Sequence, residues 1–171
     1  MTNDFTLLPD GAAAFPEIEK MAMFMWREPT SHGDYADARV TVRDREHPIT
    51  SGLPDFSTRD EIFCGMKNVW NVPFRTLATA YSDPAILSRH GRPGTGNDEG
   101  VLMVGQYGSG RTVNHSLGHV WPFYTKHGMG ENTMLSFAPR PFRKMLVRSC
   151  EWAATGDCRA TEAYDGRGLL R

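Results

Sequence analysis

A glycine turn between two extended runs constrains the fold more than any other feature of this sequence. Residues 101–107 (VLMVGQY) and 111–117 (RTVNHSL) are joined by Gly108, Ser109 and Gly110. Glycine adopts the positive φ angles that tight turns require, so the pattern predicts an antiparallel β-hairpin in the C-terminal half of the chain. At least part of the core must therefore be built on a sheet.

The spacing of apolar residues predicts a helix near each end of the chain and further strands between them. A first helix is expected from Pro16 to Trp26, where apolar residues recur at steps of three and four. A second is expected from Pro141 to Ala154, ended by Gly156. We predict strands at residues 38–43, 60–64 and 76–81, and a buried helix face formed by Phe142, Met145, Leu146 and Cys150.

The length of 171 residues predicts one domain, residues 1–156, followed by a tail, residues 157–171. A formal charge of −1 provides no basic excess for phosphate backbones, so nucleic acid is not an expected partner. The sequence has no apolar run of membrane-spanning length, and its first ten residues do not resemble a secretion signal. We therefore expect a cytoplasmic protein that does not bind membranes.

Histidines provide the main candidates for chemistry, because imidazole exchanges protons and binds metals near neutral pH. His119 comes directly after a predicted strand, a place where ligands gather in open α/β sheets. His127 lies between glycine-containing turns close to Glu131, and it either takes part in a site or only bonds to the backbone. His90 lies in a glycine-rich stretch and is expected to be solvated.

Two other groups of residues are candidates for binding or catalysis. Asp60 and Glu61 are adjacent, so on a strand they point to opposite faces and at most one can be catalytic. We assign Asp60 to the solvated surface and Glu61 to the interior, where it would orient a histidine or bind a sugar hydroxyl. The aromatic residues Trp121, Phe123 and Tyr124 either stack on a sugar or pack against the sheet.

Six short blocks, taken in order, resemble the ThuA-like (trehalose utilisation) family. The resemblance spans roughly Leu7 to Gly156 and rests on the order of the blocks, because each block alone is a weak signal. The blocks are His47-Pro-Ile-Thr-Ser-Gly-Leu-Pro54, Asp60-Glu-Ile-Phe63, Leu77-Ala-Thr79, Tyr107-Gly-Ser-Gly-Arg111, Leu117-Gly-His119 and Cys150-Glu-Trp-Ala-Ala154.

The resemblance implies a flavodoxin-like α/β sandwich, similar to class I glutamine amidotransferases, with a mostly parallel sheet. Family members carry further βα units before the segment that matches Leu7, so the resemblance also implies a chain truncated at its N-terminus. A sheet edge left open in this way favours a homo-oligomer. The counterpart of the amidotransferase cysteine is Gly11-Ala-Ala13, which has no nucleophile, so glutamine hydrolysis is not expected.

For function, the resemblance implies the catabolism of a carbohydrate, such as trehalose, another disaccharide or an oxidised sugar, by hydrolysis or isomerisation. The alternative is a non-catalytic carbohydrate-binding or assembly module with the same fold. Convergence of the histidines in one cleft beside a carboxylate would favour the enzyme. The expected catalytic residues are His119, Glu61 and Glu131, the sugar-binding residues are Trp121, Tyr124 and His127, and the ligands of a divalent metal such as zinc are His32, His119 and His127.

Overall fold

The computed structural model describes residues 15–88, 90–120, 122–125, 128–132, 134–161 and 163–167. For 122–125 and 128–132 it describes the backbone alone.

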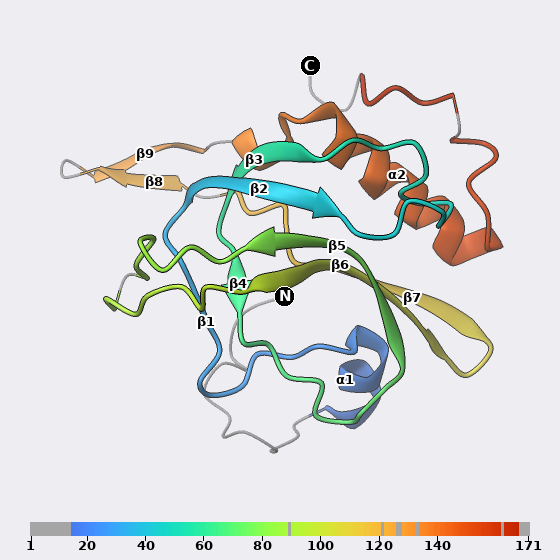
Figure 1. The fold of residues 1–171 in the computed structure, drawn as a ribbon, viewed down its shortest axis with the longest axis horizontal. Coiled ribbons are helices and arrows are strands. Elements are labelled where there is room, and N and C mark those ends of the chain that lie inside the picture. Colours follow the sequence, from blue (N-terminus) through green and yellow to red (C-terminus); the bar gives the residue numbers. More distant parts are fainter. Residues whose placement is uncertain are drawn as a thin grey trace.

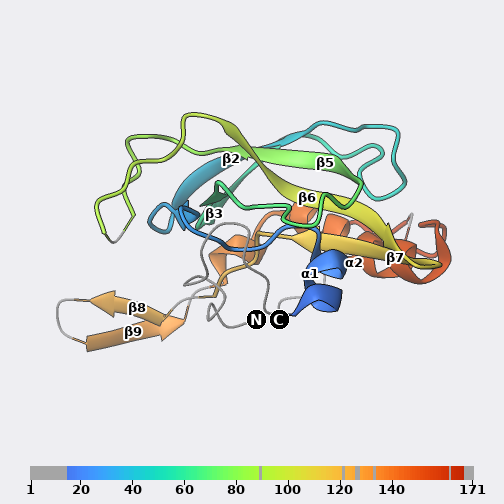
Figure 2. The same cartoon turned by 90° about the horizontal axis from the view of Figure 1, so that it is seen from below.

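A five-stranded antiparallel sheet forms the centre of the molecule, with the strand order β3-β2-β5-β6-β7 (Figure 1). Two short antiparallel pairs, β1 with β4 and β8 with β9, lie outside it, and the second pair projects from the body of the molecule (Figure 2). The strands of the central sheet are β2 (Ala36–Val42), β3 (Phe56–Asp60), β5 (Phe74–Tyr81), β6 (Asp98–Tyr107) and β7 (Gly110–His115). The short strands are β1 (Ser31–His32), β4 (Phe63–Cys64), β8 (Pro122–Thr125) and β9 (Gly128–Asn132).

The α/β class is confirmed, but the expected mostly parallel, flavodoxin-like sheet is wrong for the described residues, because every strand pair in them is antiparallel. A parallel pair needs a long crossover connection, which is usually a helix. Here helix α1 (Pro16–Ala22) precedes all the strands and helix α2 (Arg140–Thr155) follows them, so no described helix links two strands.

The predicted hairpin is confirmed as β6 and β7. Tyr107 pairs with Gly110 across the turn, and Gly108 has a φ of 57°. The strands expected around residues 38–43 and 76–81 are also confirmed, as β2 and β5. The strand expected at residues 60–64 is wrong, because β3 ends at Asp60 and β4 begins only at Phe63.

Helix α2 packs on the sheet and closes the main core. Phe142 and Met145 are fully buried among residues from β2, β5 and β6, as predicted. The same prediction for Cys150 is wrong, since Cys150 is exposed and Leu146 is only half-buried. The buried face continues instead through Arg148, whose guanidinium donates a hydrogen bond of 2.7 Å to the carbonyl oxygen of Ser51.

Candidate functional site

Strand β3 carries Asp60 into the interior. Phe56, Thr58 and Asp60 alternate with exposed residues, so they share the buried face of the strand. The Asp60 side chain is 0% exposed. Our assignment of Asp60 to the solvated surface is therefore wrong. The alternation of residues along 56–60 is the sequence signal that could have indicated its buried position.

The Asp60 carboxylate joins the end of β3 to the segment that follows β7. Its Oδ2 accepts a hydrogen bond of 2.7 Å from the backbone nitrogen of Gly118. Its Oδ1 lies 2.6 Å from Nδ1 of His119 and accepts a bond of 2.8 Å from the Glu61 backbone nitrogen. Because a carboxylate only accepts, Nδ1 of His119 carries the proton and Nε2 is the ring nitrogen left for a ligand.

Gly118 allows the chain to turn so that His119 meets Asp60. It has a φ of 107°, a conformation that L-residues with side chains rarely adopt, and a Cβ here would lie 3.2 Å from the ring of Phe137. The His119 side chain, 22% exposed, lies with its ring centroid 4.7 Å from that of Phe63. The bond to Asp60 thus fixes the orientation of the His119 ring, while part of the ring remains accessible.

A second set of hydrogen bonds fixes the backbone of His119. The hydroxyl of Ser136, a fully buried residue, lies 2.8 Å from the His119 carbonyl oxygen and 2.9 Å from that of Arg59. The backbone nitrogen of Ser136 donates a bond of 3.2 Å to the hydroxyl of Tyr35. Ser136 therefore holds together the two segments that carry Asp60 and His119, a role that the sequence analysis missed.

His119 and Glu61 line a cavity of about 980 Å³. One wall is the run of residues 112–119, along β7 and beyond it, and the opposite wall is formed by α1, the segment after it and β4. Most of the lining side chains on that opposite wall are apolar: Ile18, Met21, Ala22, Phe24, Met25, Trp26, Phe63 and Met66. The cavity thus has one largely apolar wall, and its polar groups come from Glu61, from His119 and from the residues of and after β7.

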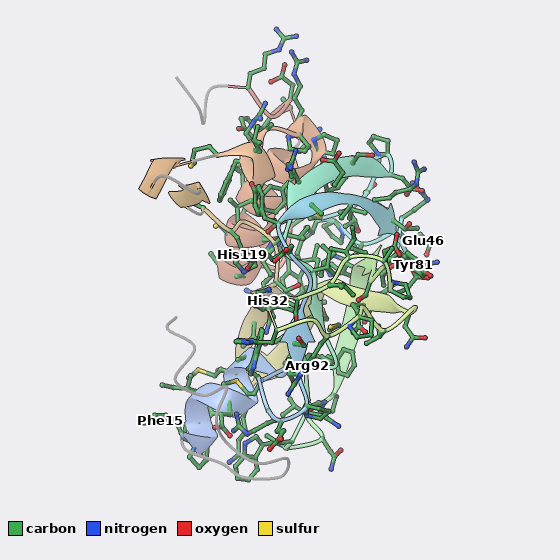
Figure 3. The ribbon with its side chains drawn as sticks, turned by 90° about the vertical axis from the view of Figure 1, so that its left-hand side faces the viewer. Phe15, His32, Glu46, Tyr81, Arg92 and His119 are labelled. Atoms are coloured by element: carbon green, nitrogen blue, oxygen red, sulfur yellow. The ribbon has the colours of Figure 1, made fainter. Side chains whose placement is uncertain are left out.

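His32, labelled with His119 in Figure 3, packs against Trp26 and Phe63, two aromatic residues that line the cavity. Its Nδ1 is 2.8 Å from the carbonyl oxygen of Gly33 and 3.6 Å from a carboxylate oxygen of Glu61. The Phe63 ring packs near both imidazoles, with its centroid 6.1 Å from that of His32 and 4.7 Å from that of His119. Glu61 therefore contacts His32, whereas Asp60 holds His119.

A further histidine, His115, lines the same cavity but lies in a different environment. Its Nε2 is 2.9 Å from the hydroxyl of Ser149, which itself donates a bond of 2.8 Å to the Met145 carbonyl oxygen. The imidazole must therefore donate to Ser149, and the buried Nδ1 has no hydrogen-bond partner among the described residues. Burial lowers the pKa of His115 to about 4, so the ring is neutral at pH 7.

Of the other predicted site residues, two lie outside the described residues and two are described by their backbone alone. Trp121 and His127 fall outside the described residues, and for Tyr124 on β8 and Glu131 on β9 only the backbone is described. In the described part of the chain, no three His, Cys, Asp or Glu side chains form a group able to hold a metal ion. The predicted metal set of His32, His119 and His127 stays a prediction.

The chain resembles a known protein in structure, whereas its sequence matches no family model and no curated protein. The similar structure, from Parabacteroides merdae, is named a "Putative thua-like protein"; the TM-score is 0.68 at 25% sequence identity. The match covers 88% of this chain and 59% of that one, so the chain spans less than two thirds of the protein it resembles. The ThuA-like resemblance is thereby confirmed.

No helix in the described part of the chain is both long enough and apolar enough to cross a bilayer.

Proposed function

We propose that this ThuA-like protein acts on a disaccharide or an oxidised sugar, with His119 as the general acid and base of a hydrolysis or an isomerisation. The observation that carries the proposal is the imidazole of His119, held by the buried Asp60 carboxylate at the wall of a cavity. An imidazole fixed in this way can take and return a proton at one defined atom.

The chemistry follows from the two ring nitrogens of His119. Nδ1 donates its proton to Asp60, so Nε2 has the free electron pair that abstracts a proton from a sugar hydroxyl, a carbon next to a carbonyl group, or a water molecule. The carboxylate then stabilises the imidazolium ion that forms, and Nε2 returns the proton to the product. General acid–base catalysis of this kind contributes about 100-fold to 10,000-fold in rate.

The walls of the cavity suit a sugar of one or two rings. Pockets for small molecules have volumes of roughly 300–1,000 Å³, and this cavity, at about 980 Å³, lies at the upper end of that range. Trp26 and Phe63, whose ring centroids are 4.7 Å apart, offer aromatic faces to the apolar side of a sugar ring. Glu61 contributes a carboxylate that accepts hydrogen bonds from sugar hydroxyls.

The expected divalent metal fits the described residues only in part. His32 and His119 each have Nδ1 bonded to an oxygen atom and Nε2 left for a ligand, as histidines that bind zinc usually do. The described residues supply no third ligand beside them, and the proposed chemistry of His119 contains no step through a metal.

The test is a comparison of His119→Ala with His90→Ala at equal folded fraction. Purified protein is incubated in D₂O with trehalose, other disaccharides and their keto derivatives, and NMR follows product formation and deuterium exchange at carbon. His119→Ala should lose turnover by about 100-fold or more, whereas His90→Ala, which alters an exposed residue, should stay near wild type.

Equal turnover of the two variants would contradict the proposal. A sugar that raises the melting temperature of the wild type, but is turned over by none of the proteins, would instead favour the carbohydrate-binding module.

A further inference from the structure

The two edges of the central sheet are covered to different extents. Along β3, the 3₁₀ helix η2 (Leu135–Phe137) bonds to the strand, because Thr58 and Arg59 both hydrogen-bond with Ser136. Along β7, no strand in the described part of the chain pairs with the outer side. The open edge of the sheet is therefore β7.

The pairing of β7 with β6 shows which backbone groups of β7 point outward. Ser116 donates its backbone N–H to the Val101 carbonyl oxygen, so the even-numbered residues of this run bond to β6. The odd-numbered residues Arg111, Val113 and His115 consequently direct both N–H and C=O away from the sheet. No described residue hydrogen-bonds to these outward groups.

The edge has few of the features by which proteins usually block strand pairing, and its one charged side chain, Arg111, is bonded to the end of α2. The segment Gly110–His115 contains no proline and no lysine, and its register with β6 has no bulge. It borders the cavity described above, whose opposite wall includes Ile18 and Met21, 40% and 39% exposed. Unpaired backbone groups beside exposed apolar side chains favour the addition of another strand.

We propose that β7 pairs antiparallel with β7 of a second copy of this chain, about a two-fold axis at Val113. The two five-stranded sheets then become continuous through an isologous contact, in which the same surface serves both copies. In this register Val113 faces Val113 of the partner subunit, Arg111 faces His115 of the partner subunit, and Thr112 faces Asn114 of the partner subunit.

The side chains of β7 suit this self-pairing. The Arg111 guanidinium already donates to the carbonyl oxygens of Trp152 and Ala154 at the end of α2. His115, which Arg111 would face across the contact, is neutral because of its burial, so no two like charges meet. Thr112 and Asn114 are uncharged polar residues whose side chains bond to Met23 and to the carbonyl oxygen of Ala22 within the same chain. A net charge of −1 per chain opposes association only weakly.

The test measures the mass of the whole chain and the exchange of its β7 amides over a range of concentrations. At high concentration we expect a dimer of about 38 kDa, twice the 19.1 kDa of one chain. On dilution, the amides of Val113 and His115 should exchange rapidly while those of Thr112 and Asn114 stay protected by β6. In the dimer all four amides should be protected. For Val113 and His115, the exchange rate in the dimer should be at least tenfold lower than in the monomer.

A matched pair of variants tests whether the outward N–H of Val113 on β7 holds the dimer together. Val113→Pro removes an N–H that points outward and makes no bond to β6, so the dissociation constant of the dimer should rise at least tenfold. Val113→Ala trims the side chain but keeps the N–H, so the dimer should persist. If Val113→Pro does not fold, Thr112→Cys with Asn114→Cys, in a Cys150→Ser background, should give a disulfide-linked dimer under oxidation.

Three results would overturn the proposal. One is a monomer at every concentration with rapidly exchanging amides at Val113 and His115. Another is a monomer in which these amides are protected, which would show that another segment of the same chain covers β7. The third is a dimer in which they exchange rapidly. None of these results depends on sugar turnover, so this proposal and the proposed function fail separately.

Discussion

His115 and His119 lie four residues apart on one stretch of chain and line one cavity, yet they differ in what they can do. His115 donates to the hydroxyl of Ser149, and burial lowers its pKa to about 4. His119 donates to the buried carboxylate of Asp60 and remains partly exposed. The partner of a histidine, more than its position along the chain, thus decides whether the ring suits packing or proton transfer.

The difference begins with the backbone between the two residues. His115 is the last residue of β7, so strand alternation turns its ring toward Phe142 and Ser149 on α2. Gly118, with its positive φ, then ends the extended run and directs His119 toward the end of β3. Two similar residues therefore enter two different environments.

The largest expected effect comes from removing the charge that holds His119. In Asp60→Asn, the side-chain amide can donate to Nδ1 of His119, which places the ring proton on Nε2 and removes the base from the cavity. Turnover of the sugar that the wild type converts in the test above should fall by about 100-fold or more, with a small change in KM. Steady-state kinetics provide the measurement.

The matched control is His115→Gln, which keeps a donor toward Ser149 and should leave turnover within about threefold of wild type, as expected away from the proton-transfer site. Equal losses in Asp60→Asn and His115→Gln would remove the functional difference between the two histidines.

The next effect concerns His115 and the pH dependence of stability. In the unfolded chain its pKa is near 6.5, and in the folded chain it is about 4, so between these values the unfolded state binds more protons. Acidification from pH 6.5 to pH 4 should therefore lower the free energy of unfolding, with a contribution from this residue of up to about 3 kcal/mol. Urea titrations at several pH values measure it, and His115→Gln should flatten the curve over this interval. An unchanged slope in the variant would show that His115 titrates normally in the fold.

A smaller effect is expected at Ser136, which hydrogen-bonds with the backbone of His119, whereas the described partner of the His115 ring is Ser149. In Ser136→Ala, the carbonyl oxygens of Arg59 and His119 lose the hydroxyl whose single proton one of them accepts at a time, so the free energy of unfolding should fall by about 1–3 kcal/mol. The NMR signals of the His119 ring should shift while those of His115 stay in place. Shifts of equal size in both rings would mean that Ser136 acts on the fold in general and not on the site.

Parts of this structure with strong local signals were predictable from the sequence. The β6–β7 hairpin followed from Gly108 and its flanking apolar runs, and α2 followed from its apolar spacing and from Gly156. The mostly parallel sheet was an expectation from family resemblance, and no local pattern tests strand direction. The prediction that Cys150 is buried was wrong because the buried face of α2 includes Arg148 instead. A charged residue is not expected there from its polarity, but the long side chain of Arg148 reaches the carbonyl oxygen of Ser51.

The site was predictable in part, for similar reasons. His119 was identified from its place after a strand, and the structure places it at the cavity. Asp60 was misassigned because β3 was not recognised as a strand ending at that residue. Ser136 carried no local signal, since its partners Arg59 and Tyr35 lie 77 and 101 residues away in the sequence.

The protonated nitrogen of His119 provides the most direct test of the central claim. Long-range ¹H–¹⁵N correlation spectra of the labelled protein, recorded at a pH where the ring is neutral, report which ring nitrogen carries the proton. We predict a proton on Nδ1 of His119 in the wild type and on Nε2 in Asp60→Asn, with His115 protonated on Nε2 in both. A proton on Nε2 of His119 in the wild type, or the same His119 spectrum in both proteins, would contradict the claim that Asp60 prepares His119 for proton transfer.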